Sequence, residues 1–201
     1  MTKNADEVAR LFEVQNGLRR SNLGQEVYPG YPGAVIANGA LRSMIWGFPL
    51  ALKSKRTGEP LKPRPVNNAR TDKLDSFMWR DSFENRRCLI PLTAWAEAQG
   101  IKGKMTRTWL SLPHSKVFAV AGIWRESDEW GPCYSMLMTD AAGDAAKIHN
   151  RMPVILEQYL WSDWTGGSPT QIRRLLEPKP WQLSVHPSEE RWATQNQLST
   201  R

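Results

Sequence analysis

The stretch AVIANGALRSMIWG, residues 34–47, is the strongest local signal for the fold. Two apolar runs flank Asn38-Gly39, a dipeptide typical of a two-residue hairpin turn because both turn positions need positive φ. We therefore predict two antiparallel strands here. The preceding YPGYPG, residues 28–33, predicts a stiff turn that leads into the first of them.

Further apolar runs extend this β-rich pattern. The runs that predict strands are 107–112, 117–124, 134–139, 153–156 and 181–185. They do not alternate strictly with helices, which argues against a parallel sheet. We expect an α+β fold around an antiparallel, barrel-like β-sheet with a few short helices.

Three segments predict those helices. Asn4 followed by Glu7 indicates a capping box at the start of a helix whose apolar stripe ends near Gly17. Residues 75–87, DSFMWRDSFENRR, predict a second helix. Ser168 as the cap and Pro169 at the first helical position predict a third.

Residues 51–65, ALKSKRTGEPLKPRP, predict a basic loop. This segment combines prolines and a glycine with basic residues, against Glu59 as its one acidic residue. Its basic residues are Lys53, Lys55, Arg56, Lys62 and Arg64.

Length and composition limit the possible classes of protein. The chain has 201 residues, 40% of them hydrophobic and 23% charged, and a formal net charge of +7. These values predict one domain over residues 1–190, a loose tail at 191–201 and a polyanionic partner. The lack of a long apolar run or a targeting segment predicts a cytoplasmic protein without membrane contact, in which Cys88 and Cys133 stay reduced.

Common catalytic motifs are absent from the chain. It has no GxxxxGK[ST], GxGxxG or HExxH, and its two cysteines have no metal-ligand spacing, so we expect no cofactor and no metal. Single polar residues remain at the ends of apolar runs, where sites are often carried on a rigid sheet. These are Asn68, Arg70, Glu97, Thr139, His149 and Arg151.

Each of these residues has a structural and a functional interpretation. Glu97 lies among apolar and small residues, so it is either a desolvated acid whose pKa is raised toward neutrality or an exposed strand-end carboxylate. His149 titrates near neutrality, and a lone histidine is either a proton-transfer residue or a hydrogen-bonded structural one. Arg70 and Arg151 would bind phosphates or form surface ion pairs.

The order of several segments resembles the SOS response-associated peptidase family over roughly residues 5–190. The most specific of them is IHNRMPVIL at 148–156. The others are WGF at 46–48, NNART at 67–71, RRCLIPLTAWAE at 86–97, VFAVAGIW at 117–124 and MLMTDAA at 136–142. Members of this family shield abasic sites in single-stranded DNA during the response to DNA damage.

The resemblance implies a fold, a chemistry and a set of site residues. The fold is a mixed α/β structure around a barrel-like sheet with a basic DNA groove. The chemistry is a covalent crosslink to an abasic site, with a peptidase activity that removes a leader. Separately, we expect a monomer without a small-molecule cofactor. An N-terminal cysteine is assisted by residues that match Asn68, Glu97 and His149. The DNA contacts match Trp46, Arg70, Thr139 and Arg151.

The chain departs from the family pattern in two places. The sequence around the family's glutamate is usually aromatic, whereas this chain has Trp95-Ala96-Glu97-Ala98. The family begins Met-Cys, whereas this chain begins Met1-Thr2 and has no cysteine before Cys88. We expect a short preceding segment that opens Met-Cys; without its thiol, an α-amine would form only a reversible Schiff base.

Three hypotheses follow for the function. The first is covalent capture of abasic sites in single-stranded DNA. The second is a DNA-binding module that shields single strands without chemistry. The third is a cysteine hydrolase that pairs Cys88 or Cys133 with His149.

Overall fold

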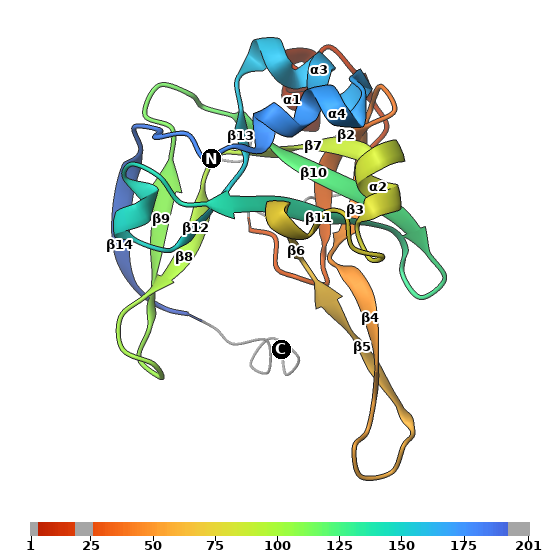
Figure 1. Cartoon of the computed structure of the whole chain (residues 1–201). Helices are drawn as coiled ribbons and strands as arrows, with labels where there is room; N and C mark the ends of the chain where they lie inside the picture. The colour runs from red at the N-terminus through yellow and green to blue at the C-terminus, as the bar shows by residue number, and fades with distance from the viewer. Residues whose placement is uncertain (1–3, 19–25, 193–201) are drawn as a thin grey trace.

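The computed structural model describes residues 4–18 and 26–192. Residues 193–201 of the tail predicted at 191–201, and the terminal Met1 and Thr2, lie outside these ranges. Within them, no helix combines the length and the apolar character needed to cross a membrane. The described chain folds into a large sheet, a smaller sheet, a projecting hairpin and a few short helices (Figure 1).

The large sheet closes on itself as a five-stranded barrel in the order β3–β2–β7–β10–β11 and back to β3. The barrel strands are β2 (Pro32–Ala37), β3 (Ala40–Trp46), β7 (Arg87–Leu92), β10 (Phe118–Ser127) and β11 (Gly131–Asp140). Four short strands extend it: β1 (Gln15–Asn16), β6 (Asn68–Arg70), β12 (Arg151–Pro153) and β13 (Ile155–Leu156). The predicted barrel-like α+β fold is therefore confirmed.

The closing pair of the barrel, β3 with β11, is parallel, although the predicted sheet was antiparallel. Its register joins Ile45 to Cys133 and Trp46 to Tyr134. The other four pairs of the ring are antiparallel. A ring with an odd number of strands cannot alternate direction throughout, so one parallel pair is unavoidable.

The Asn38-Gly39 turn joins β2 and β3 as predicted. Both residues have positive φ, 51° and 71°, and Ala37 pairs with Ala40 directly across the turn. Tyr134 on β11 packs closely against Gly33 on β2. A Cβ atom at Gly33 would collide with the Tyr134 hydroxyl. The absent side chain of Gly33 makes room for that hydroxyl.

Short helices cover the outer surface of the barrel, and Figure 1 shows most of them grouped on one side. They are α1 (Ala5–Leu11), α2 (Arg80–Asn85), α3 (Trp161–Gly166), α4 (Pro169–Ile172) and the 3₁₀ turns η1 (Thr71–Lys73), η2 (Ala145–Lys147), η3 (Gln158–Leu160) and η4 (Arg173–Leu176). Asn4 caps α1 as predicted, but its side chain accepts from the Asp6 N–H, and the helix ends at Leu11 rather than near Gly17. The Ser168 capping box with Pro169 at the first turn is confirmed.

Arg87 joins the helices to the barrel. Its guanidinium is buried and donates to four backbone carbonyls, those of Phe83, Glu84, Trp164 and Gly167, at 2.5–2.7 Å. The Trp164 indole N–H in turn donates to the carbonyl of Cys88. These bonds fix α2 and α3 against β7, because hydrogen bonds from a charged guanidinium are stronger than those between neutral groups.

A smaller sheet of β8 (Trp95–Gln99), β9 (Thr106–Ser111) and β14 (Ser184–Arg191) packs beside the barrel. Buried Trp95 and Leu110 bring it into contact with the residues that fill the barrel interior. The strand predicted at 181–185 was placed too early, because β14 is largely exposed and charged and lacks an apolar period. The helix predicted at 75–87 was too long, since α2 spans six residues.

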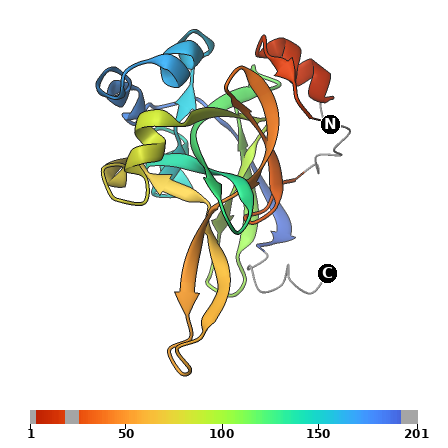
Figure 2. The ribbon, with the colours of Figure 1, turned by 90° about the vertical axis from the view of Figure 1, so that its right-hand side faces the viewer.

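The predicted basic loop at 51–65 is wrong, because this segment forms a hairpin. Strands β4 (Phe48–Lys53) and β5 (Pro60–Val66) pair with each other alone, and we call this hairpin the arm. Figures 1 and 2 show it projecting away from the barrel in both views. Both faces of its outer half meet solvent, so the segment carries no alternating apolar pattern that would have predicted strands.

Candidate functional site

Glu97 occupies the middle of β8 on the face that also carries Trp95. Its side chain is only 15% exposed, and burial raises the pKa of Glu97 to about 7. The neighbouring Trp95 indole lowers the pKa of Glu97, but by less than burial raises it. The buried Trp95 indole N–H has no hydrogen-bond partner among the described residues. Of the two interpretations of Glu97, the structure favours the desolvated acid over the exposed strand-end carboxylate. At neutral pH both protonation states are populated, which suits proton transfer.

His149 lies beside Glu97, with 3.9 Å between His149 Nδ1 and Glu97 Oε2. It follows η2, and the Arg151 backbone N–H donates to Nδ1 at 3.2 Å. The same Nδ1 lies 3.4 Å from the Arg151 carbonyl oxygen, so the Arg151 backbone holds the imidazole ring in place. The structure therefore brings an acid and an imidazole from distant segments within ion-pair distance.

Strand β11 organises most of the other predicted site residues. Strands β3 and β6 both pair in parallel with the same edge of β11. Along this edge lie three of the predicted residues, Trp46 on β3 and Asn68 and Arg70 on β6. Their partners on β11 are Tyr134, Met136 and Met138. Because these three β11 residues alternate along the strand, the side chains of their partners Trp46, Asn68 and Arg70 lie on one face of the sheet, and we call these three residues the row.

The backbone beside Asn68 is fixed by hydrogen bonds to the Asn67 carbonyl. That oxygen accepts from the Trp46 indole N–H at 2.9 Å and from the Met136 N–H at 3.0 Å. The Trp46 ring also stacks on Tyr134. Asn68 is thus presented from an anchored strand while its own side chain stays exposed.

Arg70 is already paired within its own segment. Its guanidinium makes two hydrogen bonds to the Asp72 carboxylate, at 2.8 and 2.6 Å, and holds the pKa of Asp72 below its usual value. Sequence reasoning missed Asp72, although its position two residues after Arg70 was a usable signal. An incoming phosphate would have to compete with this carboxylate.

Thr139 and Arg151 have different surroundings from this row. Thr139 is 5% exposed, and its hydroxyl donates to the Leu176 carbonyl at 2.9 Å, so its side chain is held in the interior. Arg151 lies on β12 opposite Asp140, on the other edge of β11, and is partly exposed. Arg151 is accessible for a phosphate contact, whereas the Thr139 hydroxyl is occupied.

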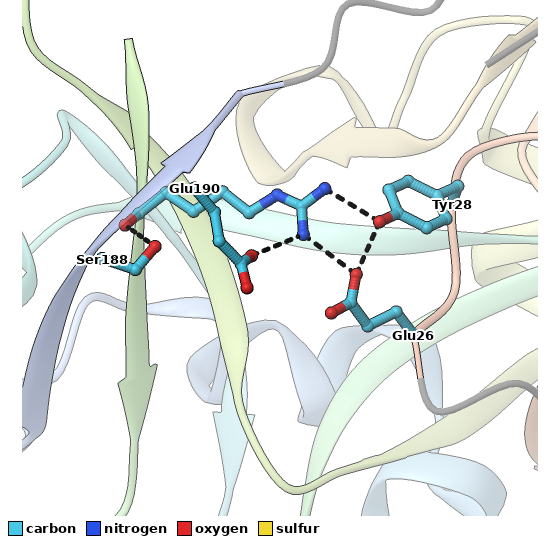
Figure 3. A network of polar contacts seen from close by, with 5 residues as sticks. Glu26, Tyr28, Ser188 and Glu190 are labelled. Carbon is cyan, nitrogen blue, oxygen red and sulfur yellow. Dashed lines mark hydrogen bonds and ion pairs between the residues drawn. The ribbon is translucent and has the colours of Figure 1, made fainter.

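A polar network anchors the sheet that carries Glu97. Arg107 on β9 donates to the carboxylates of Glu26 and Glu190, each at 3.0 Å, and to the Tyr28 hydroxyl at 2.8 Å (Figure 3). Ser188 on β14 donates to the Arg107 carbonyl. This network connects the small sheet to the segment before β2. Its members come from three distant segments, so no local sequence signal predicted it.

Both cysteines are buried in the described structure, which counts against the cysteine hydrolase hypothesis. Burial raises the pKa of the Cys88 and Cys133 thiols, so neither favours the thiolate. Among the described residues, no three His, Cys, Asp or Glu side chains are placed to hold a metal ion.

The fold combines a closed five-stranded barrel with a smaller sheet, and it brings the Glu97 carboxylate to within 3.9 Å of the His149 imidazole. The sequence model of the SOS response associated peptidase (SRAP) family matches residues 1–192, and the chain belongs to that family. No curated protein gives a significant match.

Solved structures share the fold. A protein from Bacteroides thetaiotaomicron superposes with a TM-score of 0.75 at 20% identity, over 100% of this chain and 93% of the other. A protein from Bordetella bronchiseptica gives 0.76 at 23%, over 93% and 96%. A phage-related protein from the same organism gives 0.64 at 17%, over 92% and 91%.

Proposed function

We propose that this protein binds single-stranded DNA and captures abasic sites covalently. The observation that carries the proposal is the Glu97–His149 pair, 3.9 Å apart, in which the acid has a pKa of about 7. A group that titrates at cellular pH can both donate and accept a proton. Family membership supports this use of the pair.

The proposed chemistry begins with the opened aldehyde of an abasic deoxyribose. An α-amine has a reference pKa of about 7.7–8.0, so a useful fraction is neutral and nucleophilic. Its attack on the aldehyde and the loss of one water give an imine. The thiol of an N-terminal cysteine, as the resemblance implies, then adds across the imine and closes a thiazolidine ring.

The described residues would serve separate parts of this reaction. Protonated Glu97 would donate the proton that lets water leave, and His149 would accept or donate at the sugar hydroxyl. Asn68 would hold the sugar by hydrogen bonds from its exposed amide. Trp46 and Arg151 would bind the strand by stacking and by phosphate contact.

A gel assay tests the proposal. The chain carrying an N-terminal cysteine leader is incubated with an abasic oligonucleotide and run under denaturing conditions. We expect a shifted covalent band that forms more slowly with Glu97→Gln. The same leader with serine in place of cysteine is the matched control, because it keeps the amine and removes the thiol. No shifted band with the cysteine leader would refute covalent capture.

The second candidate function is binding without chemistry. The exposed Asn68 and the partly exposed Arg151 favour it as much as capture. It predicts that binding weakens steeply with salt while no covalent product forms. Equal affinity at low and high salt would exclude it.

A further inference from the structure

The arm has a fixed root. Phe48 is fully buried, with its ring 5.1 Å from that of Trp79, and the Arg125 guanidinium lies 4.5 Å over the Phe48 ring. Ser135 on β11 donates to the Val66 carbonyl at 2.6 Å. The first pair of the arm is thus tied to the barrel, which sets the direction in which the hairpin projects.

The tip of the arm has its own ordered turn. The Ser54 hydroxyl accepts the backbone N–H groups of Arg56 and Thr57 at 3.3 and 3.2 Å. The Gly58 N–H donates to the Ser54 carbonyl at 2.8 Å. The turn is therefore held by Ser54 and the backbone, and the basic side chains of the arm are not needed to close it.

The outer arm concentrates unpaired positive charge. It carries five exposed cations against the single acid Glu59. In the part of the chain that the structure describes, none of these five side chains forms an ion pair. The five are Lys53, Lys55, Arg56, Lys62 and Arg64. Such a cluster attracts a polyanion such as a phosphodiester backbone.

The edge chemistry of the arm disfavours the addition of a protein strand. β5 contains Pro60, Pro63 and Pro65, which have no N–H to donate to an added strand. Lysines and prolines on an edge strand prevent such pairing. The large exposed hydrophobic side chains of the arm are those of the cross-strand pair Leu52 and Leu61. Charge therefore dominates what the arm offers to a partner.

The arm is continuous with the candidate site. β5 ends at Val66, and Asn68 and Arg70 follow on β6. From Val66 to Pro60 the strand reaches roughly 20 Å at about 3.3 Å per residue. One strand of a duplex carries a phosphate about every 3.4 Å, so this length corresponds to roughly six nucleotides in that geometry.

We propose that the arm binds the phosphodiester backbone of the nucleic-acid strand where that strand leaves the candidate site. This inference rests on the proposed function, since it places the same strand in the site. The arm extends the bound length beyond the site on one side, and its exposed cations supply a salt-sensitive part of the affinity.

The test compares two matched triple variants. The arm variant carries Lys53→Gln, Lys55→Gln and Arg56→Gln. The control variant removes the same charge from exposed cations outside the arm that form no ion pair among the described residues. Its substitutions are Arg10→Gln, Lys116→Gln and Arg174→Gln. Circular dichroism checks that both variants fold.

The probes are single strands with a reduced, unreactive abasic site, read by fluorescence anisotropy. One covers only the site, and two others extend it by about ten nucleotides on either side, which exceeds the arm's reach. We expect one extension to strengthen wild-type binding by at least about ten-fold. The arm variant should lose that gain and about two units of the log–log salt slope, at about 0.7 per contact.

The outcomes separate the two proposals. If the arm variant keeps as much of the extension gain as the control variant, the arm has no such role while the proposed function stands. The same conclusion follows if neither extension strengthens wild-type binding. If the wild type binds none of the strands, the proposed function fails and the arm inference fails with it.

Discussion

Replacing Glu97 by glutamine should make the protein more stable above neutral pH than the wild type is. The side chain is 15% exposed, and burial raises its pKa from 4.5 to about 7. The folded state therefore binds this proton more tightly than the unfolded state does. Glutamine has the shape of the neutral acid and never takes a charge.

The magnitude follows from linkage between protonation and folding. An acid with a raised pKa contributes stability that is fully present below the unfolded pKa of 4.5 and is lost as pH rises through about 7. Each pKa unit is worth about 1.4 kcal/mol. The free energy of unfolding of the wild type, relative to Glu97→Gln, should therefore fall by about 3 kcal/mol across that window.

Urea unfolding of both proteins between pH 4.5 and 8.5 measures this difference, because contributions common to both cancel. Glu157→Gln provides a control of opposite sign. Lys179 lies 3.0 Å from the Glu157 carboxylate and holds the pKa of Glu157 below its usual value of 4.5, so that this stability is lost only as pH falls below 4.5. The series for this control therefore extends down to about pH 2.5. A wild-type to Glu97→Gln difference that does not change with pH would refute the reasoning.

Three further substitutions test the packing. Arg87→Met should lower the free energy of unfolding by about 3 kcal/mol or more, because four carbonyls lose their buried donor; a loss below about 1 kcal/mol in urea unfolding would contradict this. Gly33→Ala should cost about 1–3 kcal/mol through its contact with the Tyr134 hydroxyl, and adding Tyr134→Phe should restore part of the loss. If the double variant is no more stable than Gly33→Ala alone, the hydroxyl is not the cause. Thr139→Val should cost about 1–2 kcal/mol by removing the donor to Leu176. Unchanged stability with weakened DNA binding would instead assign Thr139 to the DNA.

The sequence predicted those parts of the fold whose signals are local. Asn38-Gly39 required a turn with two positive φ angles, and the flanking apolar runs form β2 and β3. The arm was missed because its strands pair only with each other. With solvent on both faces, prolines and lysines are tolerated where a buried strand would need alternating apolar residues.

The candidate site was predictable in its chemistry but less so in its arrangement. The apolar neighbours of Glu97 were compatible both with a raised pKa and with an exposed carboxylate, and the burial that decides between them comes from the tertiary structure. The approach of His149 to Glu97 and the row along β11 depend on tertiary pairing between distant segments. Thr139 shows the limit most clearly, since nothing near it in the sequence indicates a hydroxyl bound to Leu176.

The parallel pair that closes the barrel has a consequence for biosynthesis. Ile45 and Cys133 are about 90 residues apart in the chain. The part of the β3 edge that β1 does not cover therefore stays unpaired when the β2–β3 hairpin leaves the ribosome. At about 5–20 residues per second, β11 follows roughly 5–20 s later. During that interval the nascent hairpin is an open template for pairing with other chains. Ribosome-bound chains truncated before residue 131 should therefore aggregate more readily than those that include β11, and light scattering of the two would measure it.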